Sequence, residues 1–184
     1  WTDGYGRVSY TTNSIISPVV KIALKEFAGD MKAVTGFDAK EKSGAPIQIY
    51  QLDQLTNKEF SAVEKLGAPL HLIITAKDAF YIGTRKGKLI VIGSNARGTA
   101  YAIMKLSELA GVSPLAAWND LQPAQRKSLY TPVDQQWIEV PRIEFRGLAL
   151  NNSQWMKPQN YSRIARLMLR LRANTLWQVD GKHE

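Results

Sequence analysis

Two groups of side chains near the C-terminal end of the sequence have the chemistry of a ligand-binding site. Asn151, Asn152 and Trp155 follow a strand predicted over residues 142–150, and Gln178, Asp180 and His183 end or follow a strand predicted over 174–179. If the two strands are parallel, both groups lie at the carboxyl edge of a sheet, where ligands of α/β proteins gather. Amides beside an aromatic ring suit sugar hydroxyls, which need paired donors and acceptors and an apolar platform. The alternative is that both groups are ordinary polar loops after strands.

The acidic residues of the same region do not supply a complete hydrolytic pair. Asp180 and His183 could act as an acid–base pair, but the sequence shows no third partner for them. Glycoside hydrolysis usually needs two carboxyl groups, one on each side of the scissile bond. From residue 142 onward the acids are Glu144, Asp180 and Glu184, and Glu144 falls inside a predicted strand. The catalytic residues are therefore unassigned from the sequence.

The composition excludes several other kinds of site. The chain of 184 residues contains no cysteine, which rules out disulfides, a cysteine nucleophile and a thiolate zinc site. Its histidines are His71 and His183, so we expect no multi-histidine metal site. Residues 93–99 lie where a phosphate loop would, but they lack the lysine that such a loop requires. We interpret them as a tight turn in which Ser94 or Asn95 caps a helix and Gly98 allows close helix–sheet contact.

The chain is basic, with 24 Lys and Arg against 16 Asp and Glu, which gives a net charge of +8. The densest cluster falls on a predicted helix and comprises Arg163, Arg166, Arg170 and Arg172. It is either a solvated face whose arginine stems cover apolar surface or a face that binds an anionic ligand. No nucleic-acid-binding motif accompanies the charge, so we expect no nucleic-acid partner. No apolar run reaches the roughly 18 residues of a membrane span.

Hydrophobic periodicity and turn residues predict an alternation of strands and helices. Ser17-Pro18 opens a helix whose apolar residues recur at helical spacing until Gly36 ends it, and Arg85-Lys86-Gly87 predicts a hairpin turn. Further helices are predicted over 57–66, 96–110 and 160–172, and strands over 46–50, 70–75, 79–84, 88–92, 142–150 and 174–179. Residues 112–141 are rich in proline and form an irregular connection, with possible short strands near 129–133 and 137–140.

The last predicted strand, helix and strand form a unit with parallel strands and a helical crossover. Such a unit cannot by itself cover both faces of its strands. We therefore expect it either to begin something larger or to pack back on the preceding residues. No secretory signal is visible after Trp1, but a mature secreted protein would look the same.

Several segments resemble, in order, the N-terminal part of large glycoside hydrolases. Met31–Gly36 resembles the end of their first helix, and residues 92–103 resemble their stretch Gly-Ser-Asp-Lys-Arg-Gly-Thr-x-Tyr-Gly-Ile. Trp118-Asn119-Asp120 matches a tryptophan-rich exit, Arg146-Gly147 resembles the first barrel strand, and residues 169–177 resemble Leu-Arg-Leu-Lys-Ala-Asn-x-Leu-Trp. The order and spacing over residues 15–178 are similar to those of glycoside hydrolase family 115, the xylan α-glucuronidases.

The resemblance implies an α/β fold. An N-terminal α+β sandwich-like domain of the hexosaminidase and glucuronidase type would occupy residues 1–140, with a connector from about residue 112. Residues 141–184 would begin a (β/α)8 TIM barrel, as its first βαβ unit. A full barrel needs about 250 residues, so most catalytic groups would lie beyond Glu184 in the rest of the parent chain, and this piece alone would be inactive.

The resemblance also implies an activity and a location. It implies inverting removal of glucuronic or 4-O-methylglucuronic acid from xylan or a related plant polysaccharide, without an organic cofactor. The parent would be secreted or periplasmic, with its signal peptide removed. Two segments depart from the family pattern: Asn151-Asn152-Ser153 stands where the family tends to have Asn-Asp-Glu, and Gln178-Val179-Asp180-Gly181 stands where it usually has Pro-Ala-Met-Trp-Gly. Both departures fall on the expected site edge, so a divergent or inactive relative stays open.

Two hypotheses from other classes remain beside the hydrolase. The chain could be a stand-alone carbohydrate-binding or scaffold module, which would bind glycans without cleaving them. A polyanion binder, the weaker hypothesis, would show a steep salt dependence of its affinity.

Overall fold

A computed structural model describes residues 1–2, 7–119, 121–150 and 157–178, which form two separate sheets. The strands are β1 (Ser9–Thr12), β2 (Lys40–Glu41), β3 (Ile47–Gln51), β4 (Phe80–Arg85), β5 (Lys88–Gly93), β6 (Gln136–Glu139), β7 (Gly147–Leu150) and β8 (Thr175–Gln178). The helices are α1 (Pro18–Thr35), α2 (Asn57–Glu64), α3 (Ala96–Leu109) and α4 (Pro158–Arg170), with short 3-10 turns η1 (Leu52–Gln54) and η2 (Leu70–Leu72). The larger sheet has the order β2-β1-β3-β5-β4-β6, and the smaller one pairs β7 with β8.

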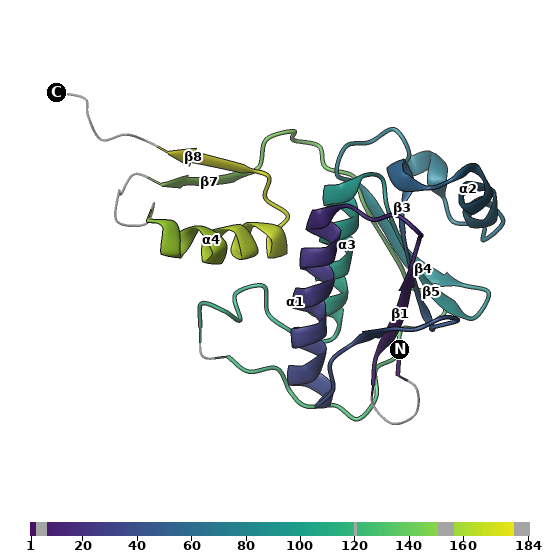
Figure 1. The fold of residues 1–184 in the computed structure, drawn as a ribbon, viewed down its shortest axis with the longest axis horizontal. Coiled ribbons are helices and arrows are strands. Elements are labelled where there is room, and N and C mark those ends of the chain that lie inside the picture. The colour runs from purple at the N-terminus through teal and green to yellow at the C-terminus, as the bar shows by residue number, and fades with distance from the viewer. Residues whose placement is uncertain (3–6, 120, 151–156, 179–184) are drawn as a thin grey trace.

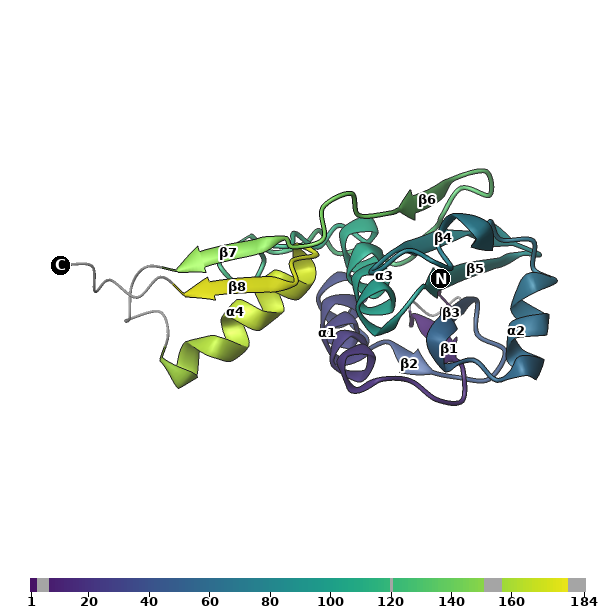
Figure 2. The same ribbon diagram turned by 90° about the horizontal axis from the view of Figure 1, so that it is seen from above.

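The larger sheet is mixed and carries helices on both faces. Strands β2, β1, β3 and β5 pair in parallel with one another, while β4 pairs antiparallel with β5 and β6. Figure 1 shows α1 and α3 on one face and α2 on the other, and Figure 2 shows the same layers from above. The smaller sheet projects from the α1–α3 side, with α4 running along it. The predicted mixed α/β fold is confirmed.

Two hydrophobic cores follow from these layers. The core between the sheet and helices α1 and α3 includes Phe27, Met31 and Ile103, all without solvent exposure. The core on the α2 face is smaller and is centred on residues such as Tyr81 and Ile92. Adjacent residues of β4 and β5 thus serve opposite cores, as the alternation of side chains along a strand requires.

Local capping follows the sequence signals closely. Gly36 ends α1 in the left-handed conformation, with φ of 85°. Lys86 and Gly87 both have positive φ, as the two-residue hairpin between β4 and β5 requires. Asn95 caps α3, because its side-chain oxygen accepts a hydrogen bond from the Gly98 N–H at 2.8 Å. The prediction of a capped turn before α3 is therefore confirmed, with Asn95 as the capping residue.

Other predicted elements need correction. Residues 70–75 do not form a strand: they begin with the 3-10 turn η2, in which the Ile73 N–H donates to the Leu70 carbonyl at 3.0 Å. Leu70 and Ile73 are buried whereas Leu72 and Ile74 are exposed, so the apolar residues follow a spacing of three rather than two. Residues 129–133 form no strand, and the strand predicted over 142–150 is limited to β7. The parallel strands β1 and β2 were not predicted.

The predicted strand–helix–strand unit is present. β7 and β8 are parallel, with Gly147 opposite Thr175 and Leu150 opposite Gln178, and α4 connects them. Gly147 permits this pairing, because a β-carbon on it would overlap the Thr175 carbonyl oxygen of the neighbouring strand.

Candidate functional site

The predicted sugar-binding residues follow β7 or β8 in the sequence, or, in the case of Gln178, end β8. The parallel register places Leu150 beside Gln178, so the chain leaves both strands at the same edge. Gln178 is the last residue of β8. Asn151, Asn152, Trp155, Asp180 and His183 lie outside the described residues, so their grouping at this edge stays a prediction.

The two-stranded sheet of β7 and β8 is exposed to solvent on one face. Trp177 is 67% exposed and Ala149, its partner in the register, is also exposed. Their neighbours Leu148 and Leu150, on the opposite face of the pair, are half-buried. The two-stranded sheet therefore has one covered face and one open apolar face, as a lone βαβ unit must.

At the opposite, amino-terminal edge of the same strands lies a buried network that the sequence analysis did not anticipate. Its centre is Asp78, whose side chain is 2% exposed. Oδ1 accepts hydrogen bonds from Asn95 Nδ2 at 3.1 Å and Arg97 Nε at 2.9 Å. Oδ2 accepts from Asn174 Nδ2 at 3.2 Å and from the Arg146 guanidinium at 3.3 Å. One carboxylate therefore joins the start of α3 to the residues that precede β7 and β8.

The charge state of Asp78 is set by these donors. Burial raises the pKa of the carboxyl, but the hydrogen bonds from Arg97, Asn95 and Asn174 outweigh it, so the pKa lies below its ordinary value. The group is ionised at neutral pH and acts as a fixed anion. A buried, fully engaged carboxylate of this kind holds structure together and is not available as a proton donor.

Glu144, the remaining described acid of the C-terminal unit, lies at this same amino-terminal edge. Its carboxylate is 2.8 Å from Lys77 Nζ, and the hydrogen bond to Lys77 lowers its pKa. It precedes β7, whereas the candidate site follows the strand. Glu144 is thus placed away from any chemistry at the carboxyl edge.

The predicted arginine cluster divides: Arg170 and Arg172 lie in an interface, whereas Arg163 and Arg166 are exposed. Arg170 donates to both oxygens of Asp30 at 2.9 Å and is 7% exposed. Arg172 lies 2.7 Å from Glu108 and 3.0 Å from Glu139. Arg163 stacks on Trp118, with its guanidinium carbon 4.5 Å from the ring centroid. The arginines for which an anionic-ligand face was one alternative therefore contact other groups of the same chain.

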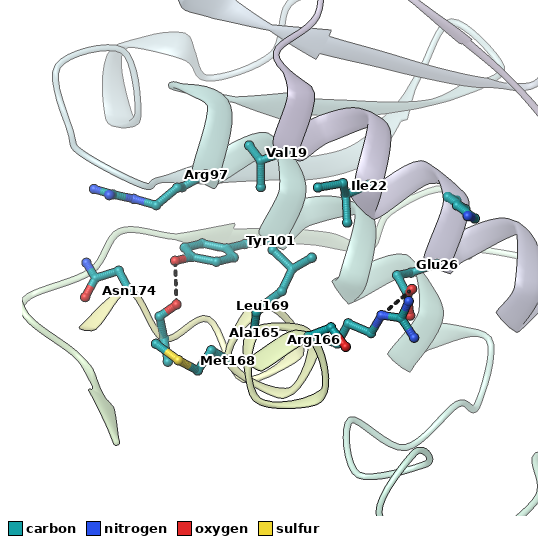
Figure 3. Close-up of a pocket in the computed structure, with 13 residues that line it drawn as sticks. Val19, Ile22, Glu26, Arg97, Tyr101, Ala165, Arg166, Met168, Leu169 and Asn174 are labelled. Atoms are coloured by element: carbon teal, nitrogen blue, oxygen red, sulfur yellow. Dashed lines mark hydrogen bonds and ion pairs between the residues drawn. The ribbon is translucent and has the colours of Figure 1, made fainter. Parts of the chain in front are cut away.

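Beside these ion pairs, α1, α3 and α4 enclose an open cavity of about 530 Å³ (Figure 3). Its walls are mainly apolar and include Val19, Ile22 and Leu169. The Tyr101 hydroxyl donates to the Ala173 carbonyl at 3.0 Å across one end, and Arg166 meets Glu26 at 3.2 Å at the other. The cavity thus separates two polar attachments of α4.

Other kinds of site find no support in the described residues. No cluster of three or more metal-ligating side chains occurs among them. None of the helices in the described part of the chain combines the length and apolarity of a membrane-crossing segment.

Comparison with solved structures identifies the class of protein that shares this fold. The chain is similar to a family GH115 4-O-methyl-α-glucuronidase with specificity for decorated arabinogalactans, with a TM-score of 0.81 and 28% identity over 94% of the chain. It is therefore GH115-like and corresponds to an N-terminal region of such proteins. The chain spans 25% of the length of that enzyme.

More distant structures share the fold alone. A GH138 enzyme targeting pectin rhamnogalacturonan II matches 95% of the chain with a TM-score of 0.58 and 13% identity, and the match spans 19% of that enzyme. A chitobiase of family GH20 from Flavobacterium johnsoniae matches 98% of the chain with a TM-score of 0.53 and 17% identity, and the match spans 26% of the chitobiase. These neighbours are all glycoside hydrolases. No protein-family model and no curated protein matches the chain.

Proposed function

We propose that this chain is the N-terminal part of a glycoside hydrolase that removes glucuronic acid or 4-O-methylglucuronic acid from a plant polysaccharide. The observations that carry the proposal are the similarity to the GH115 enzyme over 94% of the chain and the parallel β7–α4–β8 unit. In this proposal β7, α4 and β8 open a (β/α)8 catalytic barrel, which requires about 250 residues.

The proposal divides the chain near residue 140. Residues 1–140 are the accessory domain, including the connector from about residue 112, and residues 141–184 begin the barrel. The course of the sheets supports this division, because β6 completes the six-stranded sheet and β7, the next strand, belongs to the other.

Substrate contacts are assigned to the carboxyl edge of β7 and β8. Asn151, Asn152 and Gln178 offer amides for sugar hydroxyls, and Trp155 offers a ring for the apolar face of a sugar. Asp180 and His183 are the ionisable groups of this edge. No organic cofactor takes part.

The proposal also holds that these 184 residues do not hydrolyse glycosides alone. Hydrolysis usually needs two carboxyl groups on either side of the bond. Glu144 is paired with Lys77 at the far edge, which leaves Asp180 and the terminal Glu184 as the other acids of the unit. The remaining catalytic groups come from later barrel strands.

The polymer attacked lies outside the cell, so the parent is proposed to be secreted or periplasmic. Two polymers are the leading substrates. Glucuronoxylan follows from the family resemblance, and decorated arabinogalactan is the specificity of the similar GH115 enzyme.

The test is an assay of uronic acid release. The longest reading frame that contains this chain and the 184-residue chain alone are each incubated with glucuronoxylan and with glucuronic-acid-decorated arabinogalactan. We expect the long protein to release uronic acid from at least one polymer and the short chain to release none. Turnover by the short chain would refute its inactivity, and saturable glycan binding without release by the long protein would favour a binding module.

A further inference from the structure

The two sheets are joined by charges of opposite sign. The six-stranded sheet with its helices forms the larger body, and the β7–α4–β8 unit with the residues just before it forms the smaller one. Ion pairs join acids of the larger body to arginines of the smaller one. The acids are Glu26, Asp30, Asp78, Glu108 and Glu139, and the arginines are Arg146, Arg166, Arg170 and Arg172. All these ion pairs join one body to the other, so their geometry bears on how the unit is oriented.

Most of these contacts attach one end of α4. Arg170 and Arg172 lie at the C-terminal end of the helix and just after it, and the Tyr101 hydroxyl binds the Ala173 carbonyl beside them. Arg166 on Glu26 and the buried Leu169 attach the helix further along, so these contacts hold α4 and the residues just after it. The orientation of the two strands requires a further attachment that acts on the strands themselves.

Asp78 provides that attachment. Each of its oxygens serves a different body: Oδ1 binds Asn95 and Arg97 of α3, and Oδ2 binds Arg146 and Asn174 of the unit. Lys77 and Glu144 also connect the two bodies nearby, but their side chains are 76% and 59% exposed. Exposed pairs of that kind contribute little, whereas the Asp78 carboxylate is buried.

The partners of Asp78 in the unit set the starts of both strands. The Arg146 backbone N–H donates to Asn174 Oδ1 at 2.9 Å, and Asn174 Nδ2 donates to the Glu144 carbonyl at 2.7 Å. Arg146 Nε further donates to the Arg172 carbonyl at 3.2 Å. A group that fixes Arg146 and Asn174 therefore fixes the beginning of β7 and β8 together.

We propose that Asp78 is the positioning residue that sets the orientation of the β7–α4–β8 unit on the six-stranded sheet, by sharing its two carboxylate oxygens between them. The inference concerns the architecture of this chain and does not depend on the proposed function. Asparagine has one acceptor oxygen and a donor NH2 group, so Asp78→Asn can satisfy one body but presents a donor to the donors of the other.

Because the chain has no cysteine, the orientation can be measured with two introduced labels. Lys58→Cys on α2 and Gln159→Cys on α4 are exposed positions on the two bodies. Nitroxides on these cysteines give the distribution of distances between the bodies by double electron–electron resonance. We expect a single narrow distribution for the doubly labelled chain and a distribution about twofold wider when Asp78→Asn is added.

Asp38→Asn is the matched control, since Asp38 is exposed and makes no ion pair within the described residues. It should leave the width unchanged, and circular dichroism should show the same secondary structure in all variants. An unchanged distribution in folded Asp78→Asn would overturn the proposal, as would a broad distribution before any substitution. If Asp78→Asn fails to fold, Arg146→Met replaces it, because that change leaves the α3 side of the network intact. The same broadening is expected there, and an unchanged width would again overturn the proposal.

Discussion

Asn95, Arg97, Arg146 and Asn174 come from three separate segments of the sequence and meet at Asp78. The three segments are the turn before α3, the start of β7 and the start of β8. Each lies in a stretch of sequence that resembles glycoside hydrolase family 115. Their side chains attach the two bodies to each other at the amino-terminal edge of the strands. In barrel enzymes this edge serves stability, whereas chemistry takes place at the carboxyl edge.

Glu59 is a second residue whose carboxylate joins separate segments. It accepts hydrogen bonds from the backbone N–H of Ser14 and of Thr56, each at 2.9 Å, and from the Thr56 hydroxyl at 2.8 Å. The Ser14 and Thr56 bonds lower its pKa to about 2. Since the folded pKa is depressed, its stabilising effect is complete above the ordinary value near 4.5 and is lost as the pH falls toward about 2.

We expect Glu59→Gln to lower the free energy of unfolding by about 1 kcal/mol at neutral pH, because glutamine cannot accept all three bonds. The difference from the unsubstituted chain should shrink as the pH is lowered from about 5 to about 3, where the native carboxylate begins to protonate. Urea unfolding at several pH values measures both effects. Glu64→Gln, at the exposed end of the same helix, is the control. Equal unfolding curves for the two variants at neutral pH would contradict this account of Glu59.

At the scale of elements, helix α3 lies unusually close to the sheet at its first turn. A β-carbon on Gly98 would overlap the Ala79 carbonyl oxygen just before β4. Gly29, inside α1, has no atom within 4 Å of the same position and is exposed. The same substitution should therefore have opposite effects in the two helices.

Gly98→Ala is expected to destabilise the chain by about 1–3 kcal/mol, because the helix must shift away from the strand. Gly29→Ala should instead stabilise it by about 0.5–1 kcal/mol, since alanine favours a helix more than glycine does. Thermal unfolding of both variants beside the parent chain measures the pair. If the Gly98→Ala chain were as stable as the Gly29→Ala chain, the close contact between Gly98 and the Ala79 carbonyl would be contradicted.

Elements with a clear local signal could be predicted from the sequence, and those that depend on distant partners could not. Ser17-Pro18 and Gly36 mark the ends of α1, and the turn at Lys86 and Gly87 marks the hairpin, because these residues impose their own backbone geometry. β1 and β2 were missed since each is short and is held by parallel neighbours distant in sequence. The strand predicted over residues 70–75 was wrong because a run of apolar residues fits either a strand or a tight turn whose buried positions are three apart.

The candidate site divides in the same way. The parallel pairing of β7 and β8 could be predicted from the helical crossover between them, and it places their carboxyl ends side by side. The Asp78 network could not be predicted, because a lone aspartate between two apolar segments gives no local sign of its four donors. The positive φ of Asp78, 60°, two residues before β4, fits a turn that aspartate tolerates, but only the structure shows it.

At the scale of the whole molecule, the structure consists of a self-contained mixed sheet and a βαβ unit docked to it through charges. The larger sheet is covered on both faces, while the smaller sheet exposes Trp177 on its open face. Docking through buried arginine–carboxylate pairs gives a defined orientation more than it gives stability, since desolvation offsets much of the attraction. In the proposed function, this arrangement holds β7 and β8 in place as the first strands of the barrel.

The central claim is that β7 and β8 are the first two strands of a catalytic barrel, and a crystal structure of the product of the longest reading frame tests it most directly. The account predicts that β7 and β8 keep their parallel register and lie side by side in a closed eight-stranded barrel. Asn151, Trp155 and Gln178 should then lie at its carboxyl-terminal mouth. A structure in which β7 and β8 remain a two-stranded sheet, or extend into an open sheet, would contradict the claim.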